Sequence, residues 1–62
     1  MNLKPDEQAV YLFQNALYFV PNRLMAKQLV LYQIEVILRL KLKIDDQIYW
    51  KLVKEHAYDL EK

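Results

Sequence analysis

Apolar residues occupy most positions of residues 21–43, PNRLMAKQLVLYQIEVILRLKLK, in the middle of the chain. At about 100° per residue of an α-helix, four polar residues of this stretch fall on one narrow strip: Gln28, Glu35, Arg39 and Lys43. A helix that is apolar nearly all round must be covered nearly all round. A chain of 62 residues offers little else to cover it. The pattern therefore predicts that the central helix also packs against a second copy of the chain.

The flanking segments have the pattern of amphipathic helices. The first is predicted over residues 5–20, because Pro5 and the acidic residues after it suit the first helical turn. Its predicted inward face consists of Ala9, Leu12, Phe13, Ala16, Leu17 and Val20. The last is predicted over residues 45–61, with Asp45 as its cap. Its predicted inward face consists of Ile48, Tyr49, Leu52, Val53, His56 and Leu60.

The central helix is predicted over residues 22–41. Asn22 can cap its free amides, and Val20 is pushed out of the helical conformation because it precedes Pro21. Since the connection to the first helix is short, we expect these two helices to be antiparallel neighbours. The sequence therefore predicts a single all-α domain over residues 1–62, a small three-helix bundle.

Residues 34–44 allow a second interpretation. The even-numbered positions from Ile34 to Ile44 are all apolar and the odd-numbered ones are polar except Ile37, an alternation that is typical of a strand. Good helix formers, and the lack of a turn residue before this segment, favour the helix. A β-ribbon formed between two copies of the chain remains the alternative.

The residue types present exclude several kinds of chemistry. The chain has no Cys, Gly, Ser or Thr, and its one histidine is His56. This excludes disulfides, a zinc site and a glycine-rich phosphate loop. It also excludes a serine, threonine or cysteine nucleophile. We expect His56 to be a packed, hydrogen-bonded residue of the core or of an interface rather than a general base. The sequence predicts a protein that is not an enzyme and uses no cofactor.

The first residues, MNLKPDEQ, lack the charged-then-apolar layout of a signal peptide. The apolar runs along the chain are also too short to span a membrane. We therefore expect a cytoplasmic protein with no membrane partner.

Charge is segregated along the chain, although the net charge is only +1. Counting Lys and Arg against Asp and Glu, residues 1–20 carry −1, residues 21–44 carry +4 and residues 45–62 carry −2. This distribution indicates charge complementarity within the chain or between copies.

The basic residues Arg39, Lys41 and Lys43 also suit contact with nucleic-acid phosphates. A DNA-binding accessory or regulatory protein is therefore the alternative function. Asp45 and Asp46 would face the same phosphates and repel them. Nucleic acid is accordingly the less favoured partner.

Aromatic and amide side chains on the outward faces of the helices are the main candidates for contact with another protein, because such residues are enriched in protein interfaces. The predicted partner-binding residues are Tyr11, Gln14, Asn15 and Tyr18, and then Trp50 and Tyr58. Tyrosines also tolerate exposure at the rim of a bundle, so a purely structural role stays open. We expect a small regulator, adaptor or inhibitor that docks onto an unidentified protein and forms a homodimer. The predicted homodimer interface consists of Leu29, Val30, Ile34, Ile37 and Leu40.

Residues 34–55, IEVILRLKLKIDDQIYWKLVKE, resemble the short helical hairpin called the SHOCT domain. The positions that carry the resemblance are Ile44, Asp45, Asp46, Tyr49 and Leu52, whereas the turn has Leu42-Lys43 where the family usually has a glycine. The resemblance covers about a third of the chain. It implies a packing and self-association element and brings no catalytic residues.

Overall fold

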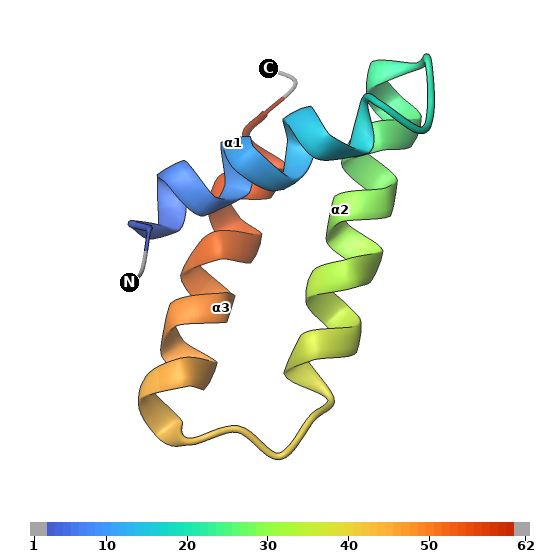
Figure 1. The fold of residues 1–62 in the computed structure, drawn as a ribbon. Coiled ribbons are helices and arrows are strands. Elements are labelled where there is room, and N and C mark those ends of the chain that lie inside the picture. Colours follow the sequence, from blue (N-terminus) through green and yellow to red (C-terminus); the bar gives the residue numbers. More distant parts are fainter. Residues whose placement is uncertain (1–2, 61–62) are drawn as a thin grey trace.

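Three α-helices make up the computed structural model, which describes residues 3–60. They are α1 (Pro5–Ala16), α2 (Arg23–Leu38) and α3 (Ile44–Tyr58), and the described range contains no strand. α2 and α3 form an antiparallel hairpin, and α1 lies across its upper part (Figure 1). The predicted all-α three-helix bundle is confirmed, and residues 34–44 do not adopt the strand alternative.

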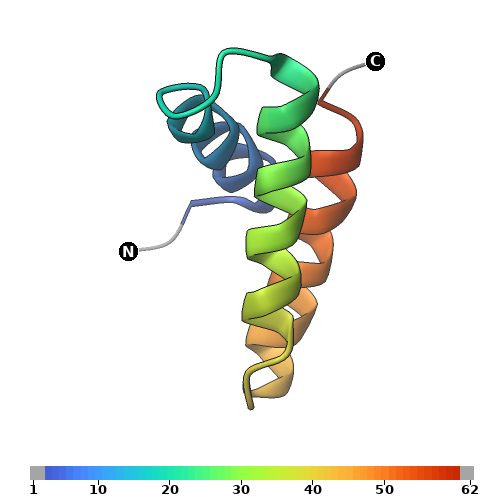
Figure 2. The same ribbon diagram turned by 90° about the vertical axis from the view of Figure 1, so that its right-hand side faces the viewer.

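The prediction that the first two helices lie side by side in antiparallel orientation is wrong. α1 crosses α2 steeply, and the two views agree on this arrangement (Figure 1 and Figure 2). In this position α1 contacts both members of the hairpin. A helix lying alongside α2 alone would leave more of α3 uncovered.

The predicted signals for the starts of α1 and α2 are found in the structure. Pro5 is the first residue of α1, and the Glu7 carboxylate accepts a hydrogen bond from the Lys4 backbone N–H at 3.1 Å. The side-chain oxygen of Asn22 accepts hydrogen bonds from two backbone amides in the first turn of α2, at 2.8 and 3.2 Å. These bonds satisfy amides that have no partner inside their own helix.

The first helix ends earlier than predicted. α1 stops at Ala16, and the backbone amides of Phe19 and Val20 both bond to the Ala16 carbonyl oxygen, at 3.0 and 3.1 Å. The residues after Ala16 form a turn, because Val20 precedes Pro21 and cannot continue a helix. The last helix also ends earlier than predicted, at Tyr58, although Glu61 itself lies outside the described residues.

The connection between α2 and α3 is longer than predicted. α2 ends at Leu38, three residues early, and Lys43 has an extended backbone, with φ −64° and ψ 156°, just before α3. The Gln47 side chain donates a hydrogen bond to the Leu42 carbonyl oxygen at 3.1 Å, which holds this turn together without glycine. Asp45 is therefore not the cap of the last helix. It lies in the first turn, where its carboxylate complements the helix dipole.

The core is small and rich in alanine. In the described range, four of the eight buried hydrophobic residues are alanines, so four larger side chains are buried, and partly buried residues such as Leu31 and Trp50 pack against them. The buried residues are Ala9, Phe13, Ala16, Ala26, Val30, Ile34, Val53 and Ala57. Alanine lets helices approach closely but removes little apolar area from water. The fold is therefore closely packed where α1 crosses the hairpin, with few large core side chains.

The buried face of α3 keeps only part of the predicted one, namely Tyr49, Val53 and Leu60, and adds Ala57. Val53 and Ala57 are buried, whereas Ile48, Leu52 and His56 are exposed. Both rows have the i, i+4 spacing of one helix face, and the small side chain of Ala57 suits the crowded crossing with α1. His56 is therefore not a core residue.

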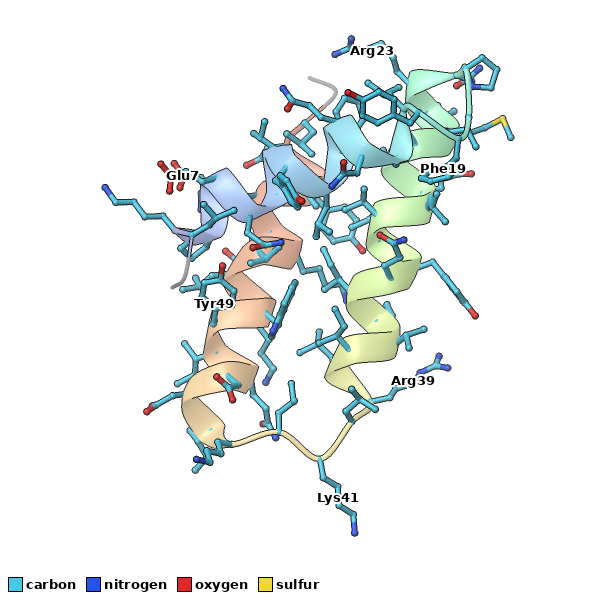
Figure 3. All side chains as sticks on the ribbon, viewed as in Figure 1. Glu7, Phe19, Arg23, Arg39, Lys41 and Tyr49 are labelled. Atoms are coloured by element: carbon cyan, nitrogen blue, oxygen red, sulfur yellow. The ribbon has the colours of Figure 1, made fainter. Side chains whose placement is uncertain are left out.

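A tyrosine joins the start of the described chain to α3. The Tyr49 hydroxyl donates a hydrogen bond to the Leu3 carbonyl oxygen at 2.7 Å, and its ring packs edge-on against Trp50. Desolvation by burial, and after it the negative charge of Glu7, raise the pKa of the Tyr49 phenol. This contact fixes the beginning of α1 against the hairpin (Figure 3).

Candidate docking surface

One side of α2 is covered by neither of the other helices. In the view of Figure 2, α1 and α3 both lie behind α2. The uncovered side carries a row of apolar residues, here called the outer stripe: Met25, Leu29, Tyr32 and Val36, followed by Leu40 just beyond the helix. Leu29 is partly buried, and Met25, Tyr32, Val36 and Leu40 are 52, 65, 40 and 57% exposed.

The outer stripe has the spacing of a helix–helix interface. Its steps along the sequence are four, three, four and four residues, and alternating steps of three and four place side chains along one seam of a helix. Another face of α2, offset from the outer stripe by about 100°, contributes Ala26, Val30 and Ile34 to the core, all with no exposed surface. α2 therefore has two apolar faces, one buried by this chain and one left open.

A groove lies beside the outer stripe, at the angle between α1 and α2. It is an open hollow of about 440 Å³, lined by Leu12, Tyr32, Gln33, Val36 and Ile37. Tyr32 and Val36 belong both to the groove and to the outer stripe. The two features form one continuous apolar surface with a single amide, that of Gln33, in its lining.

The cations in the first half of α2 interact within the chain. The Arg23 guanidinium lies over the Phe13 ring, 5.3 Å from its centroid. The Lys27 ammonium donates a hydrogen bond to the Tyr58 carbonyl oxygen at 2.6 Å. Both side chains therefore support the packing of α2 against its neighbours, and they add little charge to the outer stripe.

The predicted polar strip of α2 does not face solvent along its whole length. Glu35 forms an ion pair with Lys54 of α3 at 3.0 Å, and the hydrogen bond that Lys54 donates to the Glu35 carboxylate raises the pKa of Lys54. The edges of the outer stripe are then formed by the exposed amides Gln28 and Gln33 and by Arg39, whose side chain points away from the bundle (Figure 3). The open surface is apolar with a mainly uncharged polar edge.

The structure divides the predicted tyrosine face of the first helix. Tyr11 and Gln14 line a second shallow hollow of about 410 Å³, together with Leu3, Asp6, Glu7 and Val10. Tyr18 is 85% exposed but lies in the turn after α1, and Asn15 is half-buried. This surface mixes apolar groups with two carboxylates, unlike the outer stripe.

The predicted second patch does not form a single exposed surface. Trp50 is partly buried and packs against the core, with its ring 5.4 Å from that of Tyr49. Tyr58 is about half exposed at the end of α3. Trp50 is therefore mainly a packing residue.

Two of the five predicted homodimer residues are unavailable on the surface of the chain. Val30 and Ile34 are fully buried by α1 and α3, because α2 turns this face toward the alanine-rich crossing. Leu29 and Ile37 are partly buried, and Leu40 is exposed. Sequence reasoning did not single out Tyr32, although its place in the row of steps of three and four was a usable signal.

The predicted nucleic-acid residues lie at the end of the hairpin farthest from α1. Arg39, Lys41 and Lys43 are exposed, and Lys41 points outward from the connection (Figure 3). Asp45 and Asp46 are exposed immediately after them. Three cations against two carboxylates leave a local charge of only +1.

Comparison with protein-family models, with curated proteins and with solved structures finds no match to this chain. Residues 34–55 do form a helix, a turn and a second helix. The resemblance of this segment to the SHOCT hairpin stays a prediction. In the described range, no helix combines the length and apolar character needed to cross a membrane, and no cluster of three metal-ligating side chains occurs.

Proposed function

We propose that this protein is a non-enzymatic, cytoplasmic protein–protein interaction module, a small regulator, adaptor or inhibitor that docks through the outer stripe of α2. The observation that carries the proposal is the row of apolar residues that α1 and α3 leave open. Contiguous apolar surface with a polar edge is typical of an interaction site on a small protein. The adjoining groove supplies a concave part that a partner side chain can enter.

The balance of exposed and buried hydrophobic residues supports the proposal that a partner covers part of the surface. Thirteen large hydrophobic residues are exposed in the described range, against eight buried hydrophobic residues, four of them alanine. The accessible surface is 4867 Å² for a chain of 7.6 kDa, compared with roughly 4300 Å² expected for a compact monomer of that mass. The excess surface is a reason to expect that part of it is covered in use.

The outer stripe is a better docking surface than the tyrosine face of α1. Burying the hollow around Tyr11 would also desolvate the carboxylates of Asp6 and Glu7, which is costly unless the partner supplies cations. The outer stripe presents Tyr32 and Val36 with amides at the edge, so less charge must be desolvated. We therefore assign the primary contact to α2 and a secondary one to Tyr11 and Gln14.

Nucleic-acid binding remains the alternative proposal. Phosphate binding depends on the number of cations that meet the phosphates, and Arg39, Lys41 and Lys43 are balanced in part by Asp45 and Asp46. The apolar outer stripe would have no role in such a complex. Protein docking accounts for more of the surface.

Photo-crosslinking in living cells tests the docking proposal. A benzophenone amino acid replaces Tyr32 on α2 or, as a matched comparison, Tyr11 on α1, since the two tyrosines are 65 and 55% exposed. We expect crosslinked protein complexes several-fold more abundant from position 32 than from position 11. Crosslinking from position 11 alone would assign docking to α1 instead, and no crosslinking from either position would contradict the proposal.

A further inference from the structure

We infer that the outer stripe is occupied by a second copy of this chain, with the two α2 helices antiparallel and related by a two-fold axis between Tyr32 and Gln33. The inference rests on the proposed function, because it names the partner for the same surface. It also corrects the predicted homodimer interface, since Met25, Tyr32 and Val36 take the place of the buried Val30 and Ile34.

Four of the five outer-stripe residues form two pairs that are symmetric about this axis, and the fifth, Tyr32, lies next to it. Met25 and Leu40 are equally far along the chain from the midpoint between residues 32 and 33, and so are Leu29 and Val36. An antiparallel copy therefore places Met25 opposite Leu40 of the second copy, and Leu29 opposite its Val36. Each contact occurs twice, as a two-fold interface requires.

Leu40 can take part although α2 ends at Leu38. Arg39 keeps a right-handed helical backbone, with φ −79° and ψ −14°, and the Leu40 backbone N–H bonds to the Ile37 carbonyl oxygen at 3.1 Å. The chain thus continues the helical turn through Leu40 before it becomes extended. The outer stripe therefore extends two residues beyond Leu38, the last residue of α2.

The antiparallel arrangement keeps like charges at the edges of the outer stripe apart. In this register, Arg39 of one copy lies thirteen residues along the helix axis from Arg39 of the other. At 1.5 Å per residue, the two arginines are therefore roughly 20 Å apart. In the antiparallel pair the neighbours across the edges are Gln33 with Gln33 and Gln28 with Glu35. No like charges meet.

The available area suits a dimer of modest affinity. Taking roughly 190 Å² for a large side chain, the exposed parts of Met25, Tyr32, Val36 and Leu40 amount to about 400 Å² per copy. This is about half of the roughly 800 Å² that a standard interface buries on each partner, and the exposed amides of Gln28 and Gln33 supply further contact area. A small chain with no disulfide and an alanine-rich core gains stability from such an association.

Disulfide trapping tests the register, because the chain contains no cysteine of its own. Purified Met25→Cys and Leu40→Cys variants are mixed and oxidised, and each is also oxidised alone. We expect a disulfide-linked dimer from the mixture and at least ten-fold less from either variant alone. Linkage of each variant to itself, with none gained on mixing, would indicate a parallel pair and overturn the inference.

A charge exchange at the centre provides an independent test of the same geometry. Gln33→Glu and Gln33→Lys each place like charges across the two-fold axis, so each variant alone should be more monomeric than wild type. Mixing the two should restore association. Failure of the mixture to recover would contradict the antiparallel register.

The mass in solution decides whether the second copy is the occupant. In sedimentation equilibrium over roughly 5 to 500 µM, the mass of wild type should rise from 7.6 kDa toward twice that value. The Tyr32→Glu variant should keep the monomer mass over the same range. Its circular dichroism spectrum should be unchanged. A wild-type monomer throughout, or a dimer that Tyr32→Glu leaves intact, would overturn the inference. If position 32 then crosslinks to a different protein in cells, the docking function stands and only the identity of the occupant is wrong.

Discussion

The two apolar faces of α2 differ in solvent exposure although their hydrophobicity is similar. Ala26, Val30 and Ile34 have no exposed surface, whereas Met25 and Tyr32 on the other face are more than half exposed. The inner face packs where alanines of α1 and α3 permit close approach. Residue size at the helix crossing, rather than apolar character alone, therefore distinguishes the buried face from the open one.

Because of this difference, changes on the two faces should affect two separate properties, the stability of the monomer and its association with a partner. A change on the inner face alters contacts that exist within one chain, so it acts on the free energy of unfolding of the monomer. A change on the outer face removes contacts that we propose to exist only with a partner. Substitutions of matched chemistry on the two faces should then affect different measurements.

Shortening a side chain on the inner face should have the largest effect. Ile34→Ala removes a fully buried side chain, and such a substitution costs about 2–5 kcal/mol, a large part of the roughly 3–9 kcal/mol expected for a chain of this length. Val36→Ala on the outer face should stay within about 0.5 kcal/mol of wild type. Urea unfolding, followed by circular dichroism at a concentration that favours the monomer, checks both. Equal losses from the two variants would mean that the two faces are not distinct.

Enlarging an alanine on the inner face should have a smaller but clear effect. Ala26 is fully buried at the helix crossing, and forcing extra methylenes into a packed site costs about 1–3 kcal/mol. Ala26→Leu should therefore lower the urea midpoint, whereas Gln28→Leu, on the exposed side of the same helix, should leave it nearly unchanged. An Ala26→Leu variant as stable as wild type would show that the crossing is looser than its burial indicates.

Sequence reasoning predicted the fold class and the helices because their signals are local. Pro5 and Asn22 mark helix starts by their own conformational and hydrogen-bonding properties, and both occur where predicted. The early ends of α1 and α2 were missed because they depend on how the chain reverses. At the α2–α3 connection that reversal is held by the side chain of Gln47, five residues beyond the carbonyl it binds.

The candidate surface could be predicted only in part. The surplus of apolar residues on the central helix indicated an uncovered face, but periodicity alone did not distinguish Val30 and Ile34 from Met25 and Tyr32. That choice depends on which face the other helices reach. Ala9, Ala16 and Ala57 now supply the physical reason.

Alkaline pH should weaken the contacts within the chain by a small amount, because those contacts contain the titrating groups. The pKa values of Tyr49 and Lys54 are raised above their ordinary values of 10.0 and 10.5. The folded chain therefore holds both protons more tightly than the unfolded chain. Their contribution to stability is fully present below about pH 10 and is lost as pH rises through the raised values.

The Tyr49→Phe variant isolates the tyrosine part of this dependence. It loses the hydrogen bond to the Leu3 carbonyl oxygen, which costs at most about 1 kcal/mol at neutral pH, and it should lose less stability than wild type between pH 9 and 11.5. Tyr32→Phe, which removes an exposed hydroxyl on the outer stripe, is the matched control at neutral pH and should unfold as wild type does. Urea midpoints across this pH range provide the measurement. If Tyr49→Phe shows the full wild-type decline, the alkaline loss arises elsewhere, and the Glu35–Lys54 pair becomes the next group to substitute.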